Sequence, residues 1–159
     1  MASRWGVMFF ADPVAAFTNL HAATRAGGAL RVITWRGPHE NPFMTTAERA
    51  AAPLLDLPTR SGGEPGQFGL ADPAHIHEVL GESGWRNVEL APIDRTCSFP
   101  AAALDAYLTN LGPFGRAIRG EDEATRARVL NLVRPAFDPY LEADDVRFDA
   151  ACWLVSAQA

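Results

Sequence analysis

The chain has 159 residues, of which 48% are hydrophobic and 21% charged, as expected for a globular protein with its own core. The formal net charge of −5 argues against nucleic acid as a main partner, because phosphate binding needs a basic patch. No apolar run approaches the ~18 residues of a membrane span, and the N-terminus does not form a secretory signal. We therefore expect a cytoplasmic protein with no membrane partner.

The start of the chain predicts one helix-and-strand step of an α/β fold. Residues 12–25 predict a helix with Asp12 as its N-cap. Gly27 and Gly28 end that helix, since glycine readily adopts the conformation that closes a helix. Residues 29–35, ALRVITW, then predict a short buried strand. This succession is the repeating unit of α/β proteins.

Further helices and strands are predicted in the rest of the chain. The predicted helices cover residues 45–57, 72–82, 100–111, 113–120 and 121–141, and the predicted strands cover 86–99 and 146–157. Pro135 is expected to kink or break the last helix. Residues 58–71 are rich in glycine, proline and serine and predict a loop. We find neither an internal repeat nor a long linker, so a single domain over residues 1–159 is predicted.

Five segments spread over nearly the whole chain carry a family resemblance. They are SRWGVMFFADP (3–13), NLHAATRAGGALRVITW (19–35), HENPFM (39–44), GQFGLADPAHIHEVLGESGWRNVEL (66–90) and VRFDAACWLVSAQA (146–159). In this order they resemble the C-terminal half of a class I S-adenosylmethionine-dependent methyltransferase of the ubiquinone-biosynthesis-like branch. They correspond to the segment after the fourth strand, the fifth strand with its helix, a post-strand loop, the sixth strand with its helix, and the seventh strand. Ala26 stands where the family has a proline.

The resemblance implies an α/β fold with a partial Rossmann-like methyltransferase sheet. The family sheet runs in the order 3-2-1-4-5-7-6, so strands 5, 7 and 6 with flanking helices are expected here. The family's glycine-rich cofactor turn and acidic ribose-binding residue have no counterpart in this sequence. We therefore expect that the N-terminal cofactor-binding half is absent, and a misassigned gene start would explain this as well. The glycines of residues 62–69 are expected to lie in a loop and not in a cofactor turn.

An absent half would turn the strand at 29–35 into a sheet edge, and an apolar edge invites pairing with another chain. The apolar side chains expected on the exposed face are Trp5, Val7, Met8, Phe9 and Phe10. We predict a homodimer through this edge, with a separate N-terminal half as the other candidate partner. The alternative is that Met8, Phe9 and Phe10 form core under the first helix.

The resemblance implies S-adenosylmethionine-dependent methyl transfer to a small molecule, with S-adenosylmethionine as cofactor. Ser3 and Arg4 would lie at its methionine end. His39 and Glu40, on the loop after the strand at 29–35, are candidates for a general base, and the alternative is two solvated loop residues. Because the cofactor motifs have no counterpart, activity of the chain alone is not expected. The alternative function is a non-catalytic dimeric remnant that binds a small apolar ligand or acts through protein association.

Three further residues are candidates for binding the methyl acceptor. Trp35 and Phe43 would form an aromatic wall for an apolar acceptor, and the alternative is loop packing. Arg116 falls in an insertion that often covers the substrate in this branch, and the alternative is a surface arginine. A metal site is not expected, because His75 and His77 are two residues apart and would splay on a helix.

Overall fold

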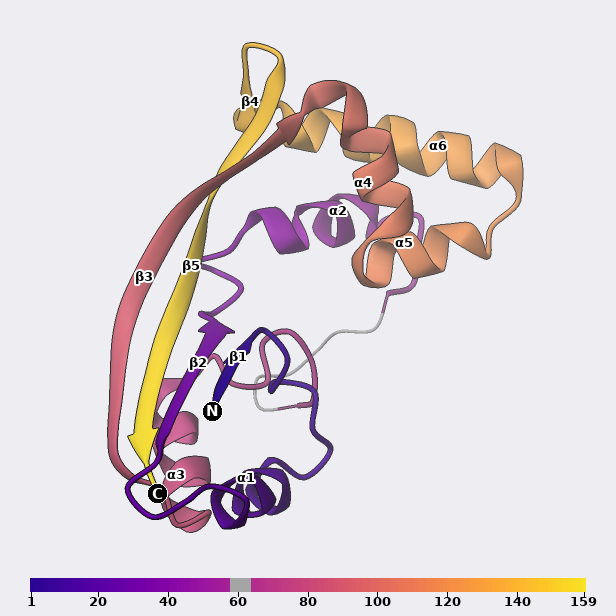
Figure 1. Cartoon of the computed structure of the whole chain (residues 1–159). Coiled ribbons are helices and arrows are strands. Elements are labelled where there is room, and N and C mark those ends of the chain that lie inside the picture. The colour runs from indigo at the N-terminus through magenta and orange to yellow at the C-terminus, as the bar shows by residue number, and fades with distance from the viewer. Residues whose placement is uncertain (58–63) are drawn as a thin grey trace. The chain divides into compact units, whose positions relative to one another are not determined.

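The computed structural model describes residues 1–57 and 64–159 and shows a mixed α/β chain with a five-stranded sheet (Figure 1). The strands are β1 (Ala2–Arg4), β2 (Ala29–Trp35), β3 (Arg86–Pro100), β4 (Leu141–Glu142) and β5 (Asp145–Gln158). The α-helices are α1 (Pro13–Ala22), α2 (Phe43–Ala51), α3 (Pro73–Glu82), α4 (Leu104–Asn110), α5 (Gly112–Arg119) and α6 (Glu123–Val133). Two 3-10 segments are η1 (Ala101–Ala103) and η2 (Arg134–Tyr140). The α/β class predicted from the sequence is confirmed.

The chain divides into two compact units, each with an apolar core of its own. Unit 1 contains the described residues 1–40, 64–94 and 150–159, and unit 2 contains 41–57 and 95–149. Strands β3 and β5 contribute residues to both units. That the two units act as one domain stays a prediction.

Unit 1 is built on the parallel pair β1 and β2, with Ser3 opposite Val32, and on β5, which runs antiparallel to β2. The strand order is β1-β2-β5-β3, so the last strand in sequence lies between the second and third. Leu30 and Val32 alternate with more exposed residues and point into the core, as the period of two in a strand requires. Helices α1 and α3 pack on that face through Phe17 and Ile76.

Local sequence explains where the two helices of unit 1 begin. Asp12 and Asp72 each precede a proline at the start of a helix. Each carboxylate accepts a hydrogen bond at 2.9 Å from a backbone N–H in the first turn, which satisfies one of the helix's unpaired donors. The cap predicted at Asp12 is confirmed. Helix α1 ends at Ala22, three residues before the predicted end at residue 25.

Unit 2 is helical apart from its strand segments, and it holds a second apolar core. Its fully buried members from α4, α5, α6, η2 and β5 are Leu108, Ile118, Val129, Val133, Phe137 and Val146. The helix predicted over 121–141 ends at Val133, and the chain continues as η2, which contains Pro135 and Pro139. Proline lacks the N–H that an α-helix needs, so the break predicted at Pro135 is confirmed. Helix α2 covers 43–51 and is shorter than the predicted 45–57.

Two short strands were not predicted. Strand β1 pairs with β2 over Arg31–Ile33, and β4 pairs with β5 in a tight hairpin around Ala143, which has a φ of 52°. The prediction that residues 29–35 form a sheet edge is therefore wrong, because β2 lies between β1 and β5. The edge of the sheet on this side is β1. Of the predicted loop at 58–71, residues 58–63 lie outside the described residues.

Candidate functional site

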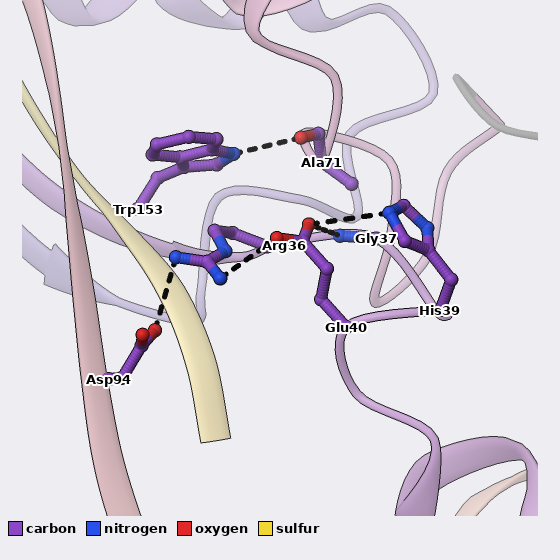
Figure 2. Close-up of polar contacts among 7 residues, drawn as sticks. All are labelled: Arg36, Gly37, His39, Glu40, Ala71, Asp94 and Trp153. Atoms are coloured by element: carbon purple, nitrogen blue, oxygen red, sulfur yellow. Dashed lines mark hydrogen bonds and ion pairs between the residues drawn. The ribbon is translucent and has the colours of Figure 1, made fainter. Parts of the chain in front are cut away.

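The loop after β2 folds into a tight turn that gathers the predicted base residues. The backbone N–H of Glu40 donates to the Gly37 carbonyl at 3.0 Å, and the Gly37 N–H donates to Glu40 Oε2 at 3.3 Å. A Cβ atom at Gly37 would lie 2.7 Å from the His39 ring, so a side chain there would push the imidazole away. The glycine thus lets the ring lie over the backbone, beside Glu40 (Figure 2).

Arg36, directly after β2, holds this turn against the sheet. Its guanidinium pairs with Glu40 Oε1 at 2.8 Å and with Asp94 Oδ1 at 3.1 Å (Figure 2). The guanidinium also lies 5.4 Å from the centre of the Trp153 ring, within the range of a cation–π contact. The Trp153 indole N–H donates to the Ala71 carbonyl at 2.9 Å, which fixes the ring. One arginine therefore joins the loop to β3 and β5.

These contacts separate the two predicted base residues by role. Both carboxylate oxygens of Glu40 are engaged, one by Arg36 and the other by the Gly37 N–H. His39 Nε2 lies 3.8 Å from Glu40 Oε2, and its side chain is 82% exposed. A small molecule can therefore reach the exposed His39 ring, whereas Glu40 is engaged within the turn.

The carboxyl end of β1 carries the predicted cofactor-binding residues. Ser3 is half-buried and lies opposite Val32 in the sheet. Arg4 is exposed, and its guanidinium lies 5.2 Å from the centre of the Trp5 ring. That ring stacks on Trp35 with centroids 4.4 Å apart and an angle of 5° between the planes. The structure therefore brings Arg4 and the predicted acceptor-binding Trp35 to the same end of β1 and β2.

The five residues predicted on an exposed interface face separate into three groups. Val7 and Met8 belong to the core of unit 1, and this corrects the expectation that they are exposed. Phe9 is 56% exposed. Trp5 and Phe10 are half-buried, and Phe10 meets Phe17 edge-on with centroids 6.1 Å apart. Among these five, only Phe9 offers a largely exposed apolar side chain.

The remaining predicted acceptor-binding residues, Phe43 and Arg116, belong to unit 2. Phe43 is buried at the start of α2 and stacks on Phe148 with centroids 3.7 Å apart. Arg116 is exposed on α5. Tyr107, also in unit 2, stacks on Phe99 at 4.9 Å, and burial raises the pKa of its phenol to about 12. The ion pairs of Arg36 and the stack of Trp5 on Trp35 both lie within unit 1.

Sequence reasoning missed Arg36, Asp94 and Trp153, which determine how the loop is held. Arg36 and Asp94 are far apart in sequence, so only the pairing of strands brings them together. Among the described residues no group of histidine, cysteine or acidic side chains has the arrangement of a metal site. Within the same residues no helix is long and apolar enough to cross a membrane.

No protein-family model matches the chain, and no curated protein matches it in sequence. Solved structures do resemble it. BH2331 from Bacillus halodurans, whose name assigns it provisionally to the methyltransferases, has a TM-score of 0.49 and 11% identity over 99% of this chain and 67% of its own. YcgJ from Bacillus subtilis has a TM-score of 0.47 and 10% identity, with 99% and 62% covered.

A third similar structure is phosphoethanolamine N-methyltransferase 2 of Haemonchus contortus, solved with phosphomonomethylethanolamine and S-adenosylhomocysteine. It has a TM-score of 0.43 and 11% identity, and the match covers 99% of this chain and 32% of the other. The chain thus spans less than two thirds of the length of YcgJ and about a third of the length of this enzyme.

Proposed function

We propose that the chain takes part in S-adenosylmethionine-dependent methyl transfer to a small molecule. The observation that carries the proposal is the strand order β1-β2-β5-β3, with β1 parallel to β2 and β5 antiparallel to β2. The sequence resemblance implies the order 5-7-6 for three strands of the methyltransferase sheet, and β2, β5 and β3 lie in that order. An antiparallel last strand inserted between two earlier ones is a specific topology, so its agreement with the resemblance supports the proposal.

The residues at the end of β1 fit part of the cofactor. S-adenosylmethionine supplies an electrophilic methyl group on a sulfonium centre, and its methionine end carries a carboxylate and an ammonium. Arg4 is exposed, forms no ion pair among the described residues and is suited to pair with that carboxylate. Ser3 beside it would add a hydroxyl. In this proposal the two residues hold the methionine end.

His39 is proposed to accept the proton that a hydroxyl or amine acceptor loses on methylation. Glu40 orients the imidazole, and Arg36 holds Glu40 in place. Alignment of acceptor and methyl group contributes most to catalysis of this kind, so the base is expected to contribute a smaller factor, about 10²-fold or more. Of the three predicted acceptor-binding residues, Trp35 lies in the same unit as His39 and is the one that this proposal retains.

The experiment that tests the function is a calorimetric titration of the purified protein with S-adenosylmethionine and S-adenosylhomocysteine. Micromolar binding that weakens in Arg4→Met supports the proposal. Arg25→Met is the matched control, because Arg25 is an exposed arginine of the same unit outside the site. A folded protein that binds neither compound, at any assembly state measured by light scattering, contradicts the proposal.

The second candidate function is a non-catalytic protein that acts through association, and the exposure of Phe9 favours it. In both cases we propose that the chain forms a homodimer through the β1 edge, with a separate N-terminal half as the alternative partner. The outward backbone groups of β1 would pair with the same groups of a second copy. Light scattering of the unchanged protein and of Phe9→Ser tests the association. An unchanged protein that stays a monomer at all concentrations contradicts the dimer. A dimer that survives Phe9→Ser argues against an interface that uses Phe9.

A further inference from the structure

The sheet of unit 1 has two faces, and the apolar core lies on only one of them. Side chains alternate between the two faces along each strand, as the period of two in a strand requires. Those of β2, β5 and β3 that belong to the core are Leu30, Val32, Val155, Ala157, Val88 and Leu90. Helices α1 and α3 also contribute to this core. No helix in the described part of unit 1 therefore covers the other face of the sheet.

This other face, here called the open face, consists of three rows of side chains across β2, β5 and β3. Asn87 Nδ2 donates to Gln158 Oε1 at 2.8 Å, and Thr96 Oγ1 donates to Asp149 Oδ1 at 2.8 Å. These contacts are nine residues apart along both strands, so the antiparallel register of β3 with β5 is continuous. With the register of β2, the three rows are Arg31, Ser156 and Glu89, then Ile33, Leu154 and Ala91, then Trp35, Cys152 and Ile93.

The centre of the open face is apolar and belongs to neither core. Ile33, Leu154 and Ile93 are half-buried, and neither core includes them among the described residues. Trp35 differs from them, because its ring stacks on Trp5 and also contacts the core of unit 1. Apolar side chains that gather on a surface with polar residues around them are typical of an interface with another molecule.

The first row carries one charge at each end, and the two signs are opposite. Arg31 on β2 and Glu89 on β3 are both exposed. Strand β5 lies between β2 and β3, so the two residues stand about 10 Å apart in one chain. Among the described residues neither takes part in an ion pair. The open face is therefore apolar in the middle, positive at one margin and negative at the other.

We infer that the open face is a contact surface for a second copy of this chain. A two-fold axis that runs along β5, between two facing sheets, sets β2 of one copy over β3 of the other. Arg31 then lies opposite the partner's Glu89, and this pair occurs twice. Ile33 lies opposite the partner's Ala91, a large side chain against a small one. Facing sheets pack about 10 Å apart, which long charged side chains at the margins can span.

The charges select this axis over the other two-fold arrangement of facing sheets. An axis across the strands would set β2 over β2 of the partner, and β2 carries no acidic residue to face Arg31. Arg4 pairs with Ile33 and thus lies on the open face, but it belongs to β1, two strands away from β5. It therefore projects beyond β3 of the partner and stays free for the cofactor. The contact goes beyond the proposed function, because it uses a face of the sheet and not the β1 edge.

Charge reversal tests the inference. Arg31→Glu and Glu89→Arg each set like charges opposite each other at both ends of the contact. We expect each variant to weaken dimerisation by about tenfold or more, as measured by light scattering over a range of concentrations. The variant with both changes has opposite signs at the same places again. Its dimerisation constant is expected to return to within about threefold of the unchanged protein.

Arg25→Glu and Glu82→Arg are the matched controls, because both residues are exposed in unit 1 and lie outside the open face. They change the net charge as the test variants do and are expected to leave dimerisation unchanged. Tryptophan fluorescence checks the fold of every variant, and it should stay the same because Arg31 and Glu89 are exposed.

The result can be separated from the tests of the proposed function. Calorimetry measures S-adenosylmethionine binding whichever surface joins the copies. A dimer that is lost in Phe9→Ser but kept in Arg31→Glu uses the β1 edge and overturns the inference. An unchanged protein that stays a monomer at all concentrations overturns it as well and leaves the open face to a different chain. A dimer that the double reversal fails to restore contradicts the pairing of Arg31 with the partner's Glu89.

Discussion

Arg36→Met removes the guanidinium that joins the loop after β2 to β3 and β5 but keeps an apolar stem of similar length. The variant loses the 2.8 Å pair with Glu40, the 3.1 Å pair with Asp94 and the ring contact with Trp153. The Arg36 side chain is only 15% exposed, so its charged hydrogen bond to Glu40 contributes about 1–2 kcal/mol. Asp94 is 59% exposed, and its pair contributes about 0.5 kcal/mol. With about 0.5–1 kcal/mol for the ring contact, we expect the free energy of unfolding to fall by about 2–3.5 kcal/mol.

Urea unfolding followed by tryptophan fluorescence measures this loss, because all 4 tryptophans lie in unit 1. Arg134→Met is the control for an exposed ion pair. Because Arg134 lies in unit 2, its effect is followed by the absorbance of the 2 tyrosines, Tyr107 and Tyr140, which lie in the same unit. Arg134 pairs with Asp105 at 2.8 Å, but the two side chains are 40% and 56% exposed, so the expected loss is below about 1 kcal/mol. If Arg36→Met lowers the free energy of unfolding by no more than Arg134→Met does, the Arg36 contacts are ordinary surface ion pairs. That result would refute the reasoning that Arg36 holds Glu40 in place.

Three further predictions concern pH and loop geometry. The hydrogen bond from Arg134 lowers the pKa of Asp105 below its usual 3.8, so this pair stabilises the fold above that pH and the contribution disappears as the pH falls through the lowered pKa. Acid unfolding curves of Arg134→Met should lack this component, and identical curves would contradict it. Burial raises the pKa of Tyr107 from 10.0 to about 12, so stability is lost as the pH rises through that range. Tyr107→Phe should remove this loss of stability. It should also remove the absorbance change that accompanies ionisation of the phenol at the raised pKa. Gly37→Ala should shift the NMR signals of the His39 ring, because the new Cβ would lie 2.7 Å from it, and unaltered signals would argue against the close packing.

Much of the local structure could be predicted from the sequence, because its causes lie within a few residues. Asp12 caps α1 through its own first turn, and Pro135 ends α6 because it has no N–H to donate. The strand at 29–35 alternates buried and more exposed residues over most of its length. The two short strands were missed, because three residues such as Ala2–Arg4 carry no periodic pattern and become a strand only through the backbone of β2.

The candidate site could be predicted only in part. The sequence placed His39 and Glu40 on the loop after a strand, and the structure shows them beside each other there. It could not show that Glu40 is engaged while His39 stays exposed, because Arg36 engages Glu40 and has its second partner, Asp94, on a distant strand. The phenol of Tyr107 likewise acquires its raised pKa from burial in the fold.

The sequence by itself determined the alternation of helices and strands, their caps and breaks, and the resemblance on which the proposed function rests. The tertiary structure decided that β1 pairs with β2 and removes its free edge, that Val7 and Met8 are core, and that Trp5 is strained with an unpaired indole. The physical reason is range. Capping and periodicity act within one or two turns of chain, whereas strand order, burial and hydrogen-bond satisfaction depend on residues that only the folded backbone brings together.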